Sequence, residues 1–235
     1  MGEVIKYIQL PFLFAPEKLQ EELSSLNTEW IAHFNKLHYE GEWSALPLKS
    51  YGGSLTNVMP DVGATSQFLD TPLMEQCPYM KSITELLPGE KRAVRLLRLK
   101  PGAIIKEHTD KELCYEDGEV RIHVPITTNE QVEFYLEGER IMMREGECWY
   151  LNFNLPHAIA NKGTTDRVHL VIDCIVNDEV KDLFEYKQHD IIKKVAVKDP
   201  YSANDKLQMI ERLKEMGTPT ANELIKKIGA SISSI

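Results

Sequence analysis

The chain has 235 residues, of which 43% are hydrophobic and 27% charged, and its formal net charge is −9. This length and composition are those of a globular protein with one full hydrophobic core, with or without a small appendage. The negative charge disfavours nucleic acid and anionic membrane surfaces as partners, and no apolar stretch approaches the roughly 20 residues of a membrane-spanning helix.

Two further features of the sequence predict a cytoplasmic protein. The N-terminal residues 1–6 contain no apolar core of a signal peptide. The cysteines are widely spaced and form no Cys-x-x-Cys pair, so we expect four reduced thiols, at Cys77, Cys114, Cys148 and Cys174.

The N-terminal part of the chain is predicted to combine one strand with two helices. The strand is expected near residues 5–10 and the first helix at residues 17–26. The second helix lies within residues 71–87, where Pro78 makes it either kinked or a shorter helix that begins at Pro78. Residues 30–53 are rich in aromatic and turn residues and carry no secondary-structure prediction.

Residues 92–177 change character and predict a β-rich domain. Short apolar and β-branched runs recur at roughly 8–12-residue spacing, separated by Pro-Gly, Asp-Gly, Glu-Gly and Lys-Gly turns. Eight strands in this rhythm are typical of a double-sheet jelly roll, the architecture of cupins. The strands are expected near residues 92–99, 103–109, 119–127, 131–136, 139–144, 147–153, 157–161 and 166–176.

The C-terminal residues 178–235 are predicted to be a helical extension of the domain formed by residues 1–177. Two helices are expected, at residues 206–216 and 221–228, each with apolar residues on one side. These apolar sides are expected to pack on the chain's own core, and a homodimer interface is the alternative.

Three side chains form a candidate set of metal ligands: His108 and Asp110 in a His-x-Asp motif, and His157 after an Asn-Leu-Pro turn. Residues two apart on a strand point to the same side, and a jelly roll can bring the seventh strand to the second. Each histidine alone is more often a turn residue or a hydrogen-bonded structural one. In combination, two imidazoles and one carboxylate can cap one face of a divalent iron and leave the other face open.

Basic residues alternate with apolar ones on two of the predicted strands. Arg167 opens the last strand, and Arg121 and His123 share one face of the strand at 119–127. Such arginines are ordinarily surface residues paired with acids. Inside a barrel, a guanidinium is costly unless it meets a carboxylate, so the pattern favours a pocket for two carboxylates, one on a cosubstrate and one on a substrate.

Two further arginines extend the predicted pocket. Arg95 and Arg98 are three residues apart, so at most one of them can face inward on a regular strand. We take Arg98, with Arg121, as the predicted substrate-binding residues. His169 shares the face of Arg167, and its role is left open among a supporting, a pocket-lining and an exposed one.

The motifs that carry chemistry here are His108-Thr109-Asp110, Arg121-Ile122-His123, Asn154-Leu155-Pro156-His157, Arg167 and Asp173. In combination they resemble the aspartyl/asparaginyl β-hydroxylase family of iron(II)/2-oxoglutarate oxygenases, in the branch with a complete His-x-Asp motif that includes bacterial cis-proline hydroxylases. The resemblance, which covers residues 92–177, implies a distorted double-stranded β-helix with iron held by His108, Asp110 and His157. It also implies that Arg167 anchors 2-oxoglutarate, with His123 beside it.

The implied reaction is hydroxylation of an unactivated C–H bond, with iron(II), 2-oxoglutarate and O2 required and ascorbate as a possible stimulant. The expected substrate is a small carboxylate-bearing molecule, such as a free amino acid. Animal members of the family that hydroxylate proteins carry glycine where Asp110 stands, which weakens the case for a protein substrate. Asp110 also fills the place that a halide would need, so halogenation is disfavoured, while desaturation stays open.

Three alternatives to a small-molecule oxygenase remain. A peptide- or protein-directed hydroxylase would need an open groove to the iron instead of a closed pocket. A cupin-like metal isomerase or hydrolase would use the same ligands without 2-oxoglutarate, and Arg167 argues against it. A non-catalytic binding module for a carboxylated ligand has no need of open metal coordination. Residues 30–53 and the C-terminal helices are expected to border the pocket.

Overall fold

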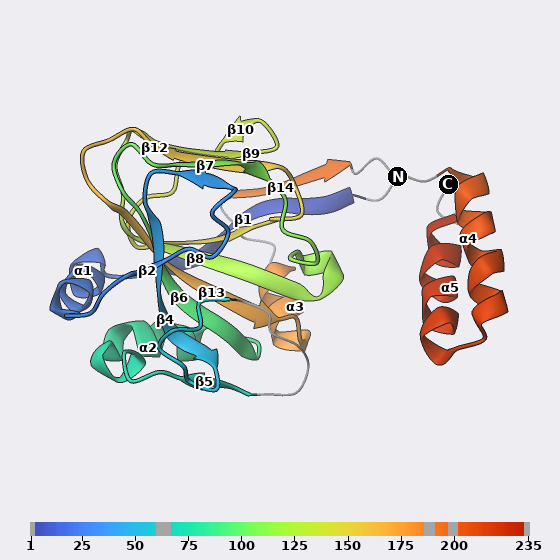
Figure 1. The fold of residues 1–235 in the computed structure, drawn as a ribbon, viewed down its shortest axis with the longest axis horizontal. Coiled ribbons are helices and arrows are strands. Elements are labelled where there is room, and N and C mark those ends of the chain that lie inside the picture. Colours follow the sequence, from blue (N-terminus) through green and yellow to red (C-terminus); the bar gives the residue numbers. More distant parts are fainter. Residues whose placement is uncertain (1–2, 60–66, 186–190, 197–201, 233–235) are drawn as a thin grey trace. The chain divides into compact units, whose positions relative to one another are not determined.

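The computed structural model describes residues 3–59, 67–185, 191–196 and 202–232 (Figure 1). The chain divides into two compact units. The larger comprises residues 5–193, and the smaller comprises residues 1–4 together with 194–235. The larger unit contains the candidate site, and the smaller contains the last two helices.

The larger of two β-sheets has its strands in the order β14-β1-β11-β8-β13-β6-β4-β2, and β5 pairs with β4. Strand β13 lies between β8 and β6 and is antiparallel to both. The strands of this sheet are β1 (Glu3–Leu13), β2 (Ile31–Ala32), β4 (Trp43–Tyr51), β5 (Phe68–Asp70), β6 (Lys91–Leu99), β8 (Glu119–Thr127), β11 (Glu147–Leu151), β13 (Arg167–Ile175) and β14 (Ile191–Ala196).

The smaller sheet has the strand order β10-β9-β12-β7-β3 and faces the larger sheet (Figure 1). Its strands are β3 (Tyr39–Glu40), β7 (Ile104–His108), β9 (Val132–Leu136), β10 (Glu139–Arg140) and β12 (His157–Asn161). The chain passes back and forth between the two sheets, which confirms the predicted double-stranded β-helix.

The main hydrophobic core lies on the face of the larger sheet that points away from the smaller sheet, under three helices (Figure 1). Alternation along the strands explains this arrangement. On β13, Val168, Leu170 and Ile172 enter the core, so the residues between them point into the space between the sheets. The helices that cover the core are α1 (Pro16–Ser25), α2 (Pro78–Leu86) and α3 (Asp178–Phe184).

Most predicted elements are confirmed, with differences at their ends. All eight strands of the predicted rhythm are present, but β10 is shorter than expected. The second N-terminal helix takes the shorter of the two expected forms, because α2 begins at Pro78 after a separate short 3₁₀ helix at Met74–Gln76. Residues 30–53, which carried no prediction, form β2, β3 and β4.

The smaller unit contains α4 (Ala203–Met216) and α5 (Pro219–Ile232), which pack against each other. A capping box between Ser202 and Asp205 begins α4, and Gly217 ends it with a φ of 60°. The predicted domain boundary at residue 177 stays a prediction, although α3, which follows it, buries Val180 and Phe184 in the main core. No helix in the described ranges is long and apolar enough to cross a membrane.

Candidate metal centre and adjoining cavity

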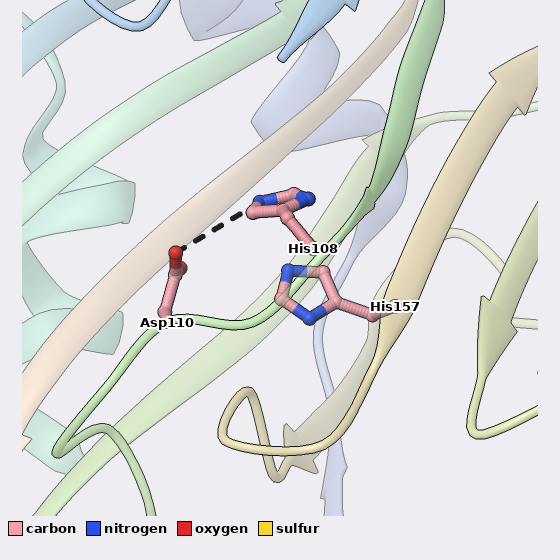
Figure 2. Close-up of side chains that lie close together, drawn as sticks. All are labelled: His108, Asp110 and His157. Atoms are coloured by element: carbon pink, nitrogen blue, oxygen red, sulfur yellow. Dashed lines mark ion pairs between the residues drawn. The ribbon is translucent and has the colours of Figure 1, made fainter.

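The three predicted metal ligands come together at one end of the smaller sheet (Figure 2). Strands β7 and β12 are neighbours, and their register places His157 directly opposite His108. Asp110 lies in the loop after β7, where its backbone N–H donates to the carbonyl of Phe153 (2.9 Å). One possible ligand atom from each of the three side chains lies within 4.8 Å of the other two. The expected convergence is therefore present, although Asp110 reaches it from a loop and not from the strand.

Both histidines are oriented by backbone carbonyls. Nδ1 of His108 lies 2.8 Å from the carbonyl oxygen of Lys106, and Nδ1 of His157 lies 3.0 Å from that of Leu155. A carbonyl oxygen can only accept, so each Nδ1 carries the proton and each Nε2 keeps its lone pair. This is the supporting contact that metal-binding histidines commonly make.

The donor set fits a divalent transition metal such as iron(II). Burial lowers the pKa of His157 to about 4, so its imidazole is neutral near pH 7 and can act as a ligand. Nε2 of His108 lies 3.8 Å from Oδ1 of Asp110, so the carboxylate faces the imidazole. Two neutral imidazoles and one carboxylate on one side suit iron(II) with open positions opposite.

A buried ion-pair network contacts Asp110 on the side away from His108. Nε and Nη2 of Arg121 donate to the two oxygens of Asp173 (2.7 and 3.1 Å). Nη1 of Arg121 donates to Oδ2 of Asp110 (3.0 Å), which leaves Oδ1 toward His108. Arg95 donates to Asp173 as well (2.6 Å). Burial alone would raise the pKa of Asp173, but the two arginines hold it below its usual value, so the carboxylate stays charged.

Arg167 is a buried cation without a carboxylate partner. Its side chain is almost inaccessible, and its Nε has no hydrogen-bond partner. Among the described residues, no ion pair joins it to an acid. Burial lowers its pKa to about 9. Because a buried unpaired charge is expensive, this guanidinium is suited to an anionic ligand.

One cavity of about 410 Å³ connects these groups. The metal-ligand set lines it together with Arg121, His123 and Arg167. His123 is buried, stacks on Phe153 at 5.2 Å between ring centroids, and has an Nε2 without a hydrogen-bond partner. The predicted metal, cosubstrate and Arg121 positions therefore share one space.

Arg98 lies elsewhere, and its expected placement is corrected. Its guanidinium donates to Ser44 (3.2 Å) and Glu42 (2.8 Å) and lies 4.3 Å above the ring of Trp30, outside this cavity. Arg95 lines the cavity instead. The strand argument that only one of the two faces inward holds, but the sequence contains no signal for which one. The substrate role of Arg121 stays a prediction.

The segment around β3 forms a further wall of the cavity, for which the sequence predicted the region but not the individual residues. His33, His38 and Trp43 line the cavity, within the aromatic stretch expected to border the pocket. His33 stacks on Trp43 at 3.3 Å between ring centroids, and burial lowers the pKa of His33 to about 3. The expectation that the C-terminal helices border the pocket stays a prediction.

Known proteins resemble this chain over most of its length. A family model described as aspartyl/asparaginyl β-hydroxylase matches residues 15–176. An L-proline cis-4-hydroxylase of Rhizobium meliloti (strain 1021) is 30% identical over 165 residues, covering 68% of this chain. The alignment spans 57% of that relative's length.

Two solved structures resemble this chain at low sequence identity. A 2OG-Fe(II) oxygenase family oxidoreductase from Burkholderia pseudomallei is 12% identical with a TM-score of 0.45, covering 67% of this chain and 77% of its own. A non-heme α-ketoglutarate-dependent epimerase of nogalamycin biosynthesis is 11% identical with a TM-score of 0.47, covering 73% and 79%.

Proposed function

Because the chain belongs to the aspartyl/asparaginyl β-hydroxylase family, we propose that it is an iron(II)/2-oxoglutarate-dependent dioxygenase. Its substrate is a small carboxylate-bearing molecule, a free amino acid or a derivative, hydroxylated at an unactivated C–H bond. The observation that carries this proposal is that one cavity is lined both by the three-residue ligand set and by the guanidinium of Arg167, which forms no ion pair with an acid among the described residues.

Two groups of cavity residues would bind the iron and the cosubstrate. His108, Asp110 and His157 would hold the iron, and Arg167 would hold the far carboxylate of 2-oxoglutarate. His123 lies on the same cavity wall as Arg167. Iron and 2-oxoglutarate, when bound, would supply oxygen activation and oxidising power, with succinate and carbon dioxide as by-products. The protein contributes orientation and the exclusion of water.

The charges behind Asp110 favour a carboxylate on the substrate. Arg95 and Arg121 face the carboxylates of Asp173 and Asp110. When Asp110 binds a divalent cation, its charge is shared with the metal, and one guanidinium is then left short of a counter-charge. A substrate carboxylate would restore the balance, and Nε of Arg95, which is buried without a partner, is a free donor for it.

The size of the cavity favours a small substrate over a protein segment. About 410 Å³ lies within the range of small-molecule sites. The relative from Rhizobium meliloti is named for an amino-acid substrate, which supports the same class. The cupin-like isomerase has no use for the buried charge of Arg167.

Two further properties belong to the proposal. We place the protein in the cytoplasm, because all four cysteines are free and buried. Burial raises the pKa of the Cys77 thiol to about 12, which makes a reactive role for it unfavourable. We keep a homodimer through α4 and α5 as a proposal, because Leu207 and Leu224 are exposed on them, and light scattering would test it.

The test is succinate formation by the iron-loaded protein with 2-oxoglutarate, O2 and ascorbate, alone and with each free amino acid including proline. Succinate that rises with one amino acid, together with a product that has gained one oxygen, is the expected result. The His108→Ala protein should form neither. If the wild-type protein neither binds nor consumes 2-oxoglutarate, the oxygenase proposal is wrong and the isomerase becomes the better explanation.

A further inference from the structure

His169, to which the sequence assigned no role, contacts both of the cavity's cosubstrate-side residues. It lies on the same face of β13 as Arg167, and its Nδ1 is 3.1 Å from Nη2 of Arg167. The same Nδ1 is 3.3 Å from Nδ1 of His123, which projects from the neighbouring strand β8. All three side chains are buried. One ring nitrogen of His169 therefore meets two partners.

The chemistry of these groups fixes where the protons are. A guanidinium can donate but cannot accept, so Nδ1 of His169 must present its lone pair to Arg167. The proton of His169 is then on Nε2. Since His169 cannot donate from Nδ1, the contact with His123 requires that His123 donates from its own Nδ1. The Nε2 of His123 is left as a bare acceptor.

The burial of His123 and His169 favours the neutral form of both imidazole rings. It lowers the pKa of His123 and of His169 well below the usual value, and the charge of Arg167 lowers both further. Neither imidazole therefore carries a second proton near pH 7. The bare Nε2 of His123 is buried in a residue that lines the cavity, and it has no hydrogen-bond partner among the described residues. Arg167 likewise has an Nε without a partner.

We propose that His169 is a positioning residue whose single lone pair holds the guanidinium of Arg167 and sets the tautomer of His123. The cavity then receives two different groups side by side. Arg167 offers N–H donors to a carboxylate, while His123 offers an acceptor to an N–H or O–H group of a ligand or a bound water. This inference rests on the proposed function for the identity of the carboxylate, 2-oxoglutarate, but the tautomers do not depend on it.

The first experiment reads the tautomers directly in the metal-free protein. Long-range ¹H–¹⁵N correlation spectra of protein labelled at histidine distinguish a protonated from a bare ring nitrogen, and the His123→Asn and His169→Asn variants assign the signals. We expect His123 to carry its proton on Nδ1 and His169 on Nε2. A proton on Nε2 of His123 would overturn the proposal. This measurement uses no cosubstrate, so it stands even if the protein binds no 2-oxoglutarate.

The second experiment compares two substitutions that differ in the acceptor. In His169→Asn the side-chain oxygen can replace Nδ1, whereas His169→Phe fills the space without an acceptor. Anaerobic calorimetry with the manganese(II)-loaded protein should show 2-oxoglutarate binding weakened about tenfold or more in the Phe variant and within about threefold of wild type in the Asn variant. Manganese affinity should be unchanged in both.

Equal weakening in both variants, or wild-type binding by the Phe variant, would contradict the role of the lone pair. If the Phe variant does not fold, the proposal is still tested by 2-oxoglutarate binding to the Asn variant and by the histidine tautomers of the wild-type protein. Absence of 2-oxoglutarate binding by the wild-type protein would instead count against the proposed function, so the two failures are distinguishable.

Discussion

Asp173 has no exposed surface, and its two oxygens face the guanidinium groups of Arg95 and Arg121. Asp173→Asn removes the charge that both arginines share and leaves two buried cations with one fewer counter-ion. We expect the free energy of unfolding in urea to fall by about 3–5 kcal/mol. Asp166→Asn is the control, because its carboxylate is 40% exposed and lies 3.9 Å from Arg98; this variant should change stability by less than about 0.5 kcal/mol. Equal losses of unfolding free energy in the two variants would show that the buried network stabilises the protein no more than an exposed ion pair does.

The convergence of His108, Asp110 and His157 could be predicted from the sequence, whereas the pairing of Asp173 with Arg95 and Arg121 could not. Short motifs contain the residues whose types indicate metal or carboxylate binding: His108, Asp110, His157 and Arg167. The pairing of Asp173 with Arg95 joins strands far apart in the sequence, and no local pattern encodes it. The single available signal was that Asp173 alternates with apolar residues on β13, on the same face as Arg167.

At the scale of elements, α1 caps α2. The side chain preceding α2 makes no capping hydrogen bond, and Glu22 of α1 accepts instead from the backbone N–H groups of Tyr79 (2.5 Å) and Met80 (2.9 Å). Glu22→Ala should lower the free energy of unfolding by about 1–2 kcal/mol, because two N–H groups and the helix dipole lose their partner. Glu21→Ala, at an exposed neighbouring position, should have little effect on the melting curve. A loss of equal size there would assign the effect to helix propensity.

The turn before β11 depends on a glycine. Gly146 has a φ of +79°, and an added Cβ would lie 2.3 Å from the carbonyl oxygen of Phe14. Gly138 has a φ of +71° but open space around it. Gly138→Ala should therefore cost about 1 kcal/mol from backbone strain alone, and Gly146→Ala clearly more, because the backbone at Phe14, just after β1, must move. Thermal denaturation of the two variants tests this, and equal melting temperatures would contradict it.

The strands that sequence reasoning missed have physical reasons for being missed. Strand β4 contains Pro47 and is buried on nearly every residue, so neither composition nor alternation marked it. The register with β6 shifts between Pro47 and Lys49, and this irregularity accommodates the proline in the sheet. The regular rhythm of residues 92–177 was readable because most of its strands end in glycine- or proline-containing turns.

At the scale of the whole molecule, buried neutral histidines make stability depend on pH. His33, His123 and His169 have pKa values lowered by burial, that of His33 to about 3. In the unfolded chain these imidazoles take up protons near pH 6.5, while in the native protein they stay neutral. Their stabilising contribution is therefore complete above pH 6.5 and is lost as the pH falls below it, by about 1.4 kcal/mol per histidine and pH unit.

Urea denaturation of the metal-free protein at about pH 7.5 and about pH 5 measures this dependence. His33→Phe should flatten the pH profile without abolishing it, because the buried imidazoles of His123, His157 and His169 remain. A free energy of unfolding that stayed constant or rose on acidification would show that these histidines are already protonated in the native state.

Alternate residues of strand β13 have two different roles: one set packs the hydrophobic core and the other faces the space between the sheets. Val168, Leu170 and Ile172 enter the core under the helices, whereas Arg167 and His169 line the space between the sheets. Selection for new chemistry can therefore act on one set of positions while selection for folding acts on the other. A directed-evolution library restricted to Arg167 and His169, which leaves the buried Asp173 unchanged, should retain many folded members, and one restricted to Val168, Leu170 and Ile172 should retain few. Relatives with different substrates could diverge along these strands one face at a time.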